Sequence, residues 1–186
     1  MNGVDIRKVT QEELRNEIGY IPQSAVLFSG TIESNLLFAK ENATEEEMKI
    51  AASIAQAEKF ISDKEEGFQT NISQGGTNIS GGQKQRLSIA RALMKKAAIY
   101  LFDDSFSALD FKTDSSLRKP LHAKVTDATI ILVAQRISTI MHADQIIVLE
   151  NGKIVGIGTH KELLATCKIY TDIADSQLSK EELGHE

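Results

Sequence analysis

Two short stretches of this 186-residue sequence combine residue types that suit phosphate chemistry. In NISGGQKQRLSIARAL, residues 78–93, Ser80 and Gln83 have the Ser-x-x-Gln spacing of a helix capping box. Gly81 and Gly82 between them leave the backbone N–H groups of the first turn uncovered, at the positive end of the helix dipole. Such a helix end favours a phosphate oxygen. By itself, the same pattern also fits a glycine-rich loop that merely starts a helix.

The second stretch, IYLFDDSFSALD (residues 99–110), reads as an apolar strand that ends in Asp103 and Asp104. In an open α/β sheet, ligands bind beyond the carboxyl ends of the strands. Carboxylates at that place in a phosphate enzyme hold Mg²⁺ and position a water molecule. Two acids at the end of a strand are also common before an ordinary turn. The sequence contains no G-x-x-x-x-G-K-[ST] loop, the usual backbone cradle for nucleotide phosphates.

The elements that would position these residues alternate between helices and apolar strands. We predict, in chain order, a helix at about 82–95, a strand at 99–103, a helix at about 110–123 and a strand at 129–134. A short helix, a strand at 145–150, another at 154–158 and a helix from His160 follow. Apolar β-branched strands that alternate with helices indicate a parallel sheet covered on both faces.

Turn and cap signals add detail to this order. The pair Asn151-Gly152 predicts a type I′ hairpin turn, and Thr159 with Glu162 predicts a capping box. Thr44 with Glu47 predicts another, at the start of a segment with helical periodicity (residues 44–67) that we interpret as a helical insertion. The opening MNGVDIRKV reads as the second arm of a hairpin that has no first arm. We therefore expect residues to be missing upstream.

Composition restricts the class of protein. With 41% apolar residues, 25% charged residues and two prolines, the chain has the profile of one globular domain. A net charge of -5 argues against a nucleic-acid-binding surface. The apolar runs are far shorter than the ~20 residues of a membrane helix. The four histidines lack metal-ligand spacing, and the single cysteine, Cys167, excludes an internal disulfide.

Together, ISGGQKQRLSIARAL and LFDDSFSALD resemble one family, the ATP-binding cassette (ABC) ATPases. The first is similar to the signature motif of that family. The second is similar to its Walker B strand and to the D-loop that follows, here Ser107, Ala108, Leu109 and Asp110. YIPQSAVLFSGTIESNL (residues 20–36) resembles the Q-loop segment of the exporter-type subset, with Gln23 as its glutamine. VAQRISTIMHADQIIVLENGKIVGIGTH (residues 133–160) resembles the switch region and the hairpin after it.

The resemblance implies an α/β fold, with a truncated P-loop NTPase (RecA-like) core that contains a parallel sheet and an α-helical subdomain that carries the signature. It implies that the helical subdomain spans about residues 33–93. A core with Walker B, D-loop and switch would span about 94–160, and C-terminal helices about 161–186. It also implies ATP and Mg²⁺ as ligands, with Asp103 and Gln23 near the metal ion.

In this family two ATP-binding domains sandwich ATP, and each site combines the phosphate loop of one domain with the signature helix of the other. The resemblance therefore implies that Ser80, Gly81, Gly82 and Gln83 contact ATP held by a partner domain, and that Asp110 reaches across the dimer. It further implies transmembrane domains as partners in the export of a substrate, and a location at the cytoplasmic face of the cell membrane.

Three features depart from the pattern of the family. Asp104 stands where a glutamate usually polarises the attacking water, and an error of roughly 1 Å there can cost on the order of 10²-fold in rate. Gln135 stands where a histidine is usual, and an amide cannot carry the charge of an imidazolium. The Walker A loop is absent, so we expect weak ATP binding by this chain alone and leave its own ATPase activity open.

These departures have a common interpretation. We expect the ATP site built on this chain's own Walker B, with Asp104 and Gln135 as its catalytic positions, to be degenerate. The intact signature would then serve the hydrolytic site of a different subunit, as in heterodimeric multidrug exporters. A test is to restore glutamate at 104 and histidine at 135 in the heterodimer.

Two other classes of protein stay open. One is a soluble ABC ATPase without a transport role, against which the exporter-like LFSGTIESNL argues. The other is a truncated, non-catalytic remnant that acts only as a binding module, which the missing Walker A loop supports. We also expect Arg86 and Arg91 on the signature helix to pair with local carboxylates. Phe28 is expected to pack within the helical subdomain or against a helix of the membrane domains.

Overall fold

The computed structural model describes residues 3–178, which fall into two compact units that adjoin in sequence between Val133 and Ala134. Among the described helices, none has the length and apolarity that a membrane crossing requires.

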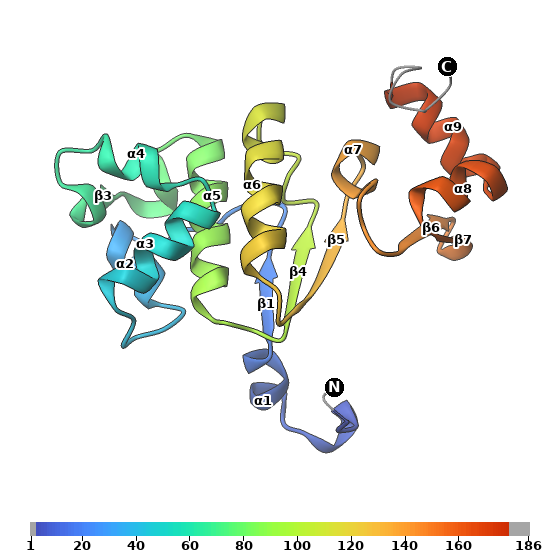
Figure 1. Cartoon of the computed structure of the whole chain (residues 1–186). Helices are drawn as coiled ribbons and strands as arrows, with labels where there is room; N and C mark the ends of the chain where they lie inside the picture. Colours follow the sequence, from blue (N-terminus) through green and yellow to red (C-terminus); the bar gives the residue numbers. More distant parts are fainter. Residues whose placement is uncertain (1–2, 179–186) are drawn as a thin grey trace. The chain divides into compact units, whose positions relative to one another are not determined.

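A three-stranded parallel sheet forms the centre of the first unit (Figure 1). Its strands are β1 (Ile18–Ile21), β4 (Ile99–Asp103) and β5 (Thr129–Val133), in the order β1-β4-β5. Phe102 lies opposite Ile21 on one side and Leu132 on the other. Ile21 and Phe102 are fully buried, as the apolar strand ending in two acids predicted. The parallel α/β class is therefore confirmed, and strands 99–103 and 129–133 lie where they were expected.

Two long helices contribute to the core around this sheet. Helix α5 (Gly81–Met94) contacts β1, and it places Leu87 and Ile89 in the core. Helix α6 (Phe111–Lys124) places Leu117 and Leu121 in the same buried cluster as Phe102. Both helices match the predicted ranges to within about one residue. The sheet is thus covered by elements that begin at the signature turn and at the D-loop.

Shorter elements lie between β1 and α5 (Figure 1). They are β2 (Gly30–Thr31), α2 (Ile32–Leu37), α3 (Glu45–Ile54), α4 (Glu58–Ser62), η2 (Gly67–Gln69), β3 (Asn71–Ile72) and η3 (Gln74–Gly76). The predicted helical segment 44–67 begins with the expected Thr44–Glu47 capping box, but it is broken after α3. Gln56 adopts a left-handed φ of 56°, and its carbonyl accepts a 2.8 Å hydrogen bond from Arg86. This contact with a distant arginine stabilises the break.

The start of the chain differs from the prediction of a hairpin arm. Residues Ile6–Lys8 form a short 3₁₀ helix, η1, and Gln11–Asn16 form helix α1. The side chain of Asp5 accepts a hydrogen bond from the backbone of Arg7 and so caps η1. A hairpin arm needs a partner strand, and within residues 3–178 no strand pairs with this segment. The prediction of an arm was therefore wrong for the described residues from Gly3 on.

The second unit contains a hairpin and three helices. Helix α7 (Ile137–Ile140) precedes β6 (Ile146–Glu150) and β7 (Lys153–Gly158), and α8 (His160–Thr166) and α9 (Lys168–Gln177) follow. The φ angles of Asn151 and Gly152 are 50° and 74°, which confirms the predicted type I′ turn. The Thr159–Glu162 capping box is also present. A small core centred on Leu163 and Tyr170 holds these elements together.

Candidate nucleotide-binding site

The two acids of the predicted Walker B motif lie at the carboxyl end of β4. Asp103 is the last residue of the strand, and Asp104 follows with a left-handed φ of 46°. The backbone N–H of Asp104 donates to the carbonyl of Val133 at 2.9 Å, which extends the pairing with β5. The buried hydroxyl of Ser105 donates to the carbonyl of Ile21 at 2.7 Å. The turn is thus fixed to both neighbouring strands, while both carboxyl-bearing residues stay half-buried.

Each acid accepts a hydrogen bond from β1 or from the segment that follows it. The phenol of Tyr20 donates to Asp103 Oδ2 at 2.8 Å, and Gln23 Nε2 donates to Asp104 Oδ2 at 3.0 Å. The hydrogen bond to Asp103 raises the pKa of Tyr20, because it holds the phenol in its protonated form. The structure therefore brings together Gln23, Asp103 and Asp104, and it adds Tyr20, which the sequence analysis missed.

These oxygen-bearing groups fit a magnesium ion. Mg²⁺ prefers oxygen ligands, and it is usually held by one or two carboxylates together with the phosphates of a substrate. Asp103 and Asp104 supply two carboxylates at one strand end, and Gln23 adds an amide beside them. Within residues 3–178, no three histidine, cysteine or acidic residues form a metal cage by themselves. Phosphate oxygens would have to supply further ligands.

The signature helix is joined to the segment that carries Gln23. Gln85, which is buried on α5, donates from Nε2 to the carbonyl of Pro22 at 3.1 Å. The residue after Pro22 is Gln23, whose amide reaches Asp104. The helix, the segment after β1 and the acids after β4 therefore form one continuous arrangement in the first unit.

The first turn of α5 has the geometry that its sequence predicts. Ser80 is the N-cap, its Oγ accepts from the backbone of Gln83 at 3.2 Å, and Gln83 Oε1 accepts from the backbone of Ser80 at 3.1 Å. A Cβ atom at Gly81 would meet nothing within 4 Å, so this turn is open to a ligand. A Cβ atom at Gly82 would lie 3.8 Å from the carbonyl oxygen of Ala108. The signature turn therefore lies beside the D-loop of the same chain.

The D-loop is held between the acids and helix α6. Ser107 Oγ donates to the carbonyl of Asp104 at 2.6 Å, and Leu109 is buried. Asp110 caps α6, because its carboxylate accepts from Thr113 Oγ1 at 2.7 Å and from the Thr113 backbone at 2.9 Å. These bonds lower the pKa of Asp110, and Arg86 lowers it further by its charge. Ala108 is exposed between these fixed residues.

Gln135 belongs to the second unit. Gln135 is exposed, and its backbone carbonyl accepts a hydrogen bond from Gln177 Nε2 at 2.9 Å. Gln177 Oε1 also accepts from the backbone of Ile137 at 2.9 Å, so the end of α9 fixes the start of α7. The backbone around Gln135 is thus anchored within its own unit.

The two arginines of α5 do not form the expected carboxylate pairs. Arg86 donates to the carbonyls of Gly82 and Gln56, and its guanidinium lies 4.9 Å from the ring centre of Phe60. Arg91 donates to the carbonyl of Val26. Burial lowers the pKa of both side chains. The partners are instead the backbone carbonyls of Gly82, Gln56 and Val26, so that prediction was wrong.

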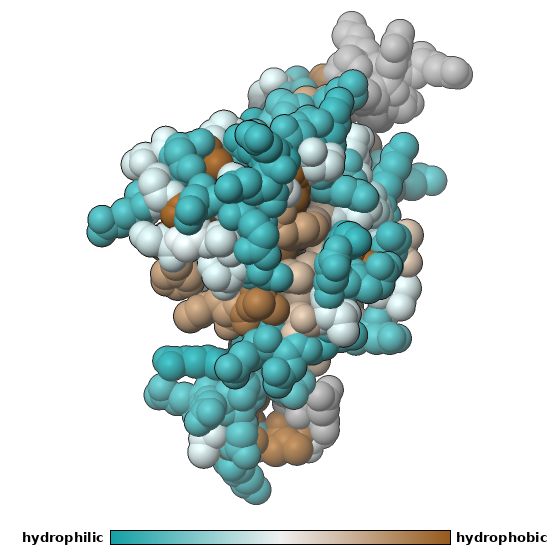
Figure 2. Space-filling view, turned by 90° about the vertical axis from the view of Figure 1, so that its left-hand side faces the viewer, coloured by the Kyte–Doolittle hydropathy of each residue, from teal (hydrophilic) through white to brown (hydrophobic). Residues whose placement is uncertain are grey.

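An exposed aromatic patch follows the Gln23 segment. Phe28 and Phe38 lie with their ring centres 4.6 Å apart and are 45% and 71% exposed, and Val26 is 58% exposed. The guanidinium of Arg91 lies 5.3 Å from the ring centre of Phe28. Hydrophobic surface also gathers in the middle of the face seen from the side of α2 to α4 (Figure 2). We call Val26, Phe28 and Phe38 the aromatic patch.

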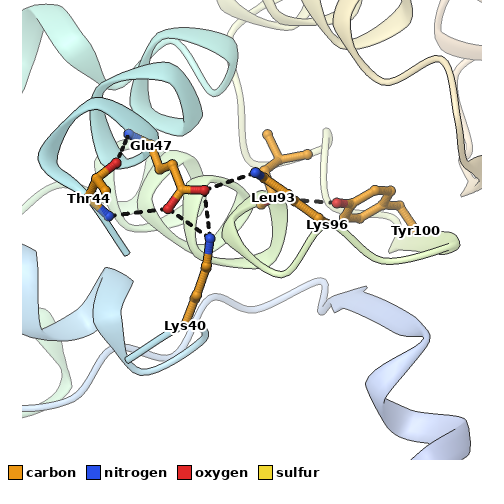
Figure 3. A network of polar contacts seen from close by, with 6 residues as sticks. All are labelled: Lys40, Thr44, Glu47, Leu93, Lys96 and Tyr100. Carbon is orange, nitrogen blue, oxygen red and sulfur yellow. Dashed lines mark hydrogen bonds and ion pairs between the residues drawn. The ribbon is translucent and has the colours of Figure 1, made fainter. Parts of the chain in front are cut away.

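A charged network ties the loop after this patch to the far end of α5 (Figure 3). Glu47 accepts from Lys40 Nζ at 2.6 Å and from Lys96 Nζ at 2.9 Å. These bonds, first that from Lys40 and then that from Lys96, lower the pKa of Glu47 to about 2. Lys96 follows the C-cap of α5, while Lys40 lies two residues after Phe38. Glu47 on α3 therefore bridges the loop before α3 and the residue that follows the C-cap of α5.

Comparison with known proteins places these features in a family. Residues 1–107 match the family model described as ABC transporter. An uncharacterized ABC transporter ATP-binding protein of Mycobacterium tuberculosis (strain H37Rv) is 49% identical over 180 residues, which cover 95% of this chain and 31% of the relative. A putative multidrug export ATP-binding/permease protein of Staphylococcus aureus (strain NCTC 8325) is 41% identical over 177 residues, with the same coverage.

The fold has a close counterpart among solved structures. The structure of a bacterial Atm1-family ABC exporter with ATP bound superposes with a TM-score of 0.91 at 37% identity, over 96% of this chain and 31% of that one. The chain spans about a third of the length of the curated relatives it matches.

Proposed function

The chain belongs to the ABC transporter family, and from this membership we propose that it acts as the ATP-binding part of an exporter, coupling ATP binding and hydrolysis to the movement of a substrate across a membrane. The observation that carries the proposal is the convergence of three distant segments. Gln23 contacts Asp104 at 3.0 Å, Gln85 contacts the carbonyl of Pro22 at 3.1 Å, and Gly82 adjoins Ala108. The exporter class is supported by the similarity to a putative multidrug export protein and to an Atm1-family ABC exporter.

The residues of this chain have separate roles in the proposed reaction. Bound Mg²⁺ would neutralise charge on the phosphates as the terminal phosphoryl group is transferred to water. Asp103 would hold that ion, and Asp104 would orient the attacking water and accept its proton. Gln23 would keep the Asp104 carboxylate in place through the bond already described. The half-burial of both acids would strengthen these interactions.

The signature turn would act on a nucleotide held by a second ABC domain. The open N–H groups at Gly81 and Gly82 and the capped dipole of α5 suit the γ-phosphate of ATP. Ser80 would add its hydroxyl, and Gln83 would keep the cap in place. The D-loop, from Ser107 to Asp110, would lie at the same interface, because it adjoins Gly82. The partner domain is proposed to be a different subunit.

The site on this chain's own acids is proposed to be degenerate. Asp104 is one methylene shorter than the glutamate usual at this position, so its carboxylate would lie roughly 1 Å short of the water, which can cost on the order of 10²-fold in rate. Gln135 can donate a hydrogen bond to a phosphate oxygen, but it supplies no positive charge. Hydrolysis would then take place mainly at the other site, with ATP held here.

The aromatic patch is the proposed contact with the membrane domains. Val26, Phe28 and Phe38 are apolar yet exposed, and they follow directly on the Gln23 segment. A helix from the membrane domains packed on this patch would sense the position of Gln23. Such contacts would hold the chain at the cytoplasmic face of the membrane.

Restoration of the usual residues tests the degenerate site. In the exporter assembled with its partner subunit, the double substitution Asp104→Glu and Gln135→His is expected to raise the ATPase rate. The signature of the partner must be left unchanged, and Asp104→Asn serves as the control for a site that cannot activate water. An unchanged rate in the double variant would show that degeneracy does not reside in these two positions.

A non-catalytic binding module is a second candidate, and one observation favours it: Asp104 and Gln135 stand where the family usually has a glutamate and a histidine. Titration of the chain with labelled ATP, with and without a partner ABC domain, separates the two functions. The exporter proposal expects weak binding alone and strong binding with the partner. A binding module expects no change when the partner is added.

A further inference from the structure

We propose that Tyr20 is a positioning residue for the magnesium ion, because its phenol fixes the orientation of the Asp103 carboxylate. This inference rests on the proposed function above, in which Asp103 holds the ion. Asp103 has one oxygen, Oδ2, bonded to Tyr20 at 2.8 Å. The remaining oxygen and its lone pairs stay available to a metal ion.

The sheet register explains why these two residues meet. In β1 and β4, Ile21 lies opposite Phe102 and Tyr20 lies opposite Leu101. Because side chains alternate along a strand, Tyr20, Leu101 and Asp103 project from one face, and the buried Ile21 and Phe102 project from the other. The long side chain of Tyr20 therefore reaches one position further along the same face. The pairing of β1 with β4 therefore places Tyr20 where its phenol can donate to Asp103.

A phenol at this point has a specific chemical effect. Hydrogen bonds to a metal-binding side chain orient it, and loss of such a partner typically lowers metal affinity 10- to 100-fold. Tyr20 is a neutral donor to Asp103, so it orders the carboxylate without neutralising its charge. Gln23 has the same relation to Asp104. Each acid thus has its own donor from β1 or the residues just after it.

The exposure of Tyr20 separates this role from a role in packing. Its side chain is 52% exposed, whereas Tyr100 and Tyr170 are buried. Removal of the hydroxyl alone, by Tyr20→Phe, leaves the ring in place and empties no part of the core. A change in metal binding without a change in stability would therefore report on the hydrogen bond.

Manganese binding by the chain with ATP present tests the proposal, because phosphate oxygens supply the further ligands of the ion. Water-proton relaxation enhancement reports Mn²⁺ bound to the protein, and Mn²⁺ shares the preference of Mg²⁺ for oxygen ligands. We expect Tyr20→Phe to weaken Mn²⁺ binding by about tenfold, with an unchanged midpoint of thermal unfolding. Asp103→Asn should abolish the binding. Tyr170→Phe, which removes a phenol hydroxyl from the second unit, should leave it unchanged.

The outcomes separate this inference from the proposed function. If Asp103→Asn abolishes Mn²⁺ binding and Tyr20→Phe does not weaken it, the positioning role is overturned while the metal role of Asp103 stands. If Asp103→Asn has no effect, or the unsubstituted chain binds no Mn²⁺ when ATP is present, the metal role of Asp103 fails and the role of Tyr20 fails with it. Equal weakening by Tyr20→Phe and Tyr170→Phe would also overturn the inference, because a general loss of phenol groups would then explain it.

Discussion

Ser105 anchors the turn that carries both acids. Its side chain is fully buried, and its hydroxyl donates to the backbone carbonyl of Ile21. Tyr20 and Gln23 hold the carboxylates of Asp103 and Asp104 from the side of β1. The side chains of both acids are therefore held from β1 and the segment after it, while the backbone of the turn is bonded to both neighbouring strands.

Replacement of this serine should weaken the whole fold. Ser105→Ala leaves the carbonyl of Ile21 without that donor in a buried place, which costs about 1–3 kcal/mol in the free energy of unfolding. Urea denaturation measures this change. Ser62→Ala is the matched control, because the Ser62 hydroxyl donates to the carbonyl of Lys59 at an exposed site. Equal effects of the two substitutions would contradict the anchoring role of Ser105.

Helix α5 is stabilised by its N-terminal cap and is hydrogen-bonded to two other segments of the first unit. Its first turn is capped by Ser80 and Gln83, its buried Gln85 reaches the carbonyl of Pro22, and Arg86 caps the break at Gln56. Its far end is joined through Lys96 to Glu47 on α3. These contacts therefore connect α5 to the Gln23 segment and to α3.

The two contributions of Ser80 can be separated by two substitutions. Ser80→Ala removes the cap and should lower the free energy of unfolding by about 1 kcal/mol, whereas Ser80→Gly should lower it by only a few tenths. Both substitutions remove the hydroxyl that is proposed to contact ATP of the partner. Thermal unfolding and the ATPase rate of the assembled exporter are the two measurements. Equal activity in Ser80→Gly and the unsubstituted protein would limit Ser80 to capping.

The Glu47 network should stabilise the fold in a pH-dependent way. The pKa of Glu47 lies at about 2 in the folded chain and near 4.5 for an unperturbed glutamate. The stabilisation that the ionised Glu47 carboxylate gives to the fold is therefore complete above about pH 4.5, and it is lost as the pH falls towards 2. The difference in melting temperature between the unsubstituted chain and Glu47→Gln should shrink over that range.

A paired glutamate on the same helix gives the control for Glu47. Glu45 has one ion pair, with Lys49, and its side chain is 70% exposed. Glu45→Gln should have a smaller effect at neutral pH, since exposed pairs contribute little. If the difference in melting temperature between Glu47→Gln and the unsubstituted chain did not change with pH, the charge of Glu47 would not account for its effect on stability.

The edge of the three-stranded sheet at β5 is apolar. Strand β5 ends the order β1-β4-β5, and within residues 3–178 no strand pairs with its other edge. Ile131 and Val133 are 46% and 49% exposed. An exposed apolar edge without charges is a template for pairing with another chain.

The isolated chain should therefore self-associate. Light scattering at rising concentration should show species larger than a monomer, and Val133→Lys should reduce them because a charge on an edge strand opposes pairing. Ile50→Lys is the control, since it adds the same charge at a residue of α3 that is 45% exposed. A monomer at high concentration, or equal effects of both lysines, would contradict association through β5.

Local signals predicted much of this structure, and distant contacts account for the errors. Capping boxes at Thr44, Ser80 and Thr159 and the turn at Asn151 were predicted because they depend on neighbours within four residues. Strand β1 was not predicted, since its pairing with β4 defines it. The break at Gln56 depends on Arg86, 30 residues away.

In the candidate site, too, short motifs predicted some residues, whereas a contact between distant residues was not predicted. Gln23, Asp103 and Asp104 were named from short motifs, and the structure brings them together. Tyr20 was missed because its contact with Asp103 spans 83 residues and follows from strand register alone. A sequence pattern identified the acids, but only the register of β1 against β4 identified the donor that orients one of them.

The most direct test of the central claim is the ATPase rate of the exporter assembled with its partner subunit, measured with Ser80→Arg and with Asp104→Asn in this chain. If the signature serves the hydrolytic site of the partner, Ser80→Arg should lower the rate by on the order of 10²-fold, because it blocks donors aimed at the transferred phosphate. Asp104→Asn should lower it by less than about twofold, because Asp104 would belong to the proposed degenerate site, where its loss would add little to a handicap of ~10²-fold. The reverse order, with Asp104→Asn abolishing activity and Ser80→Arg sparing it, would contradict the account.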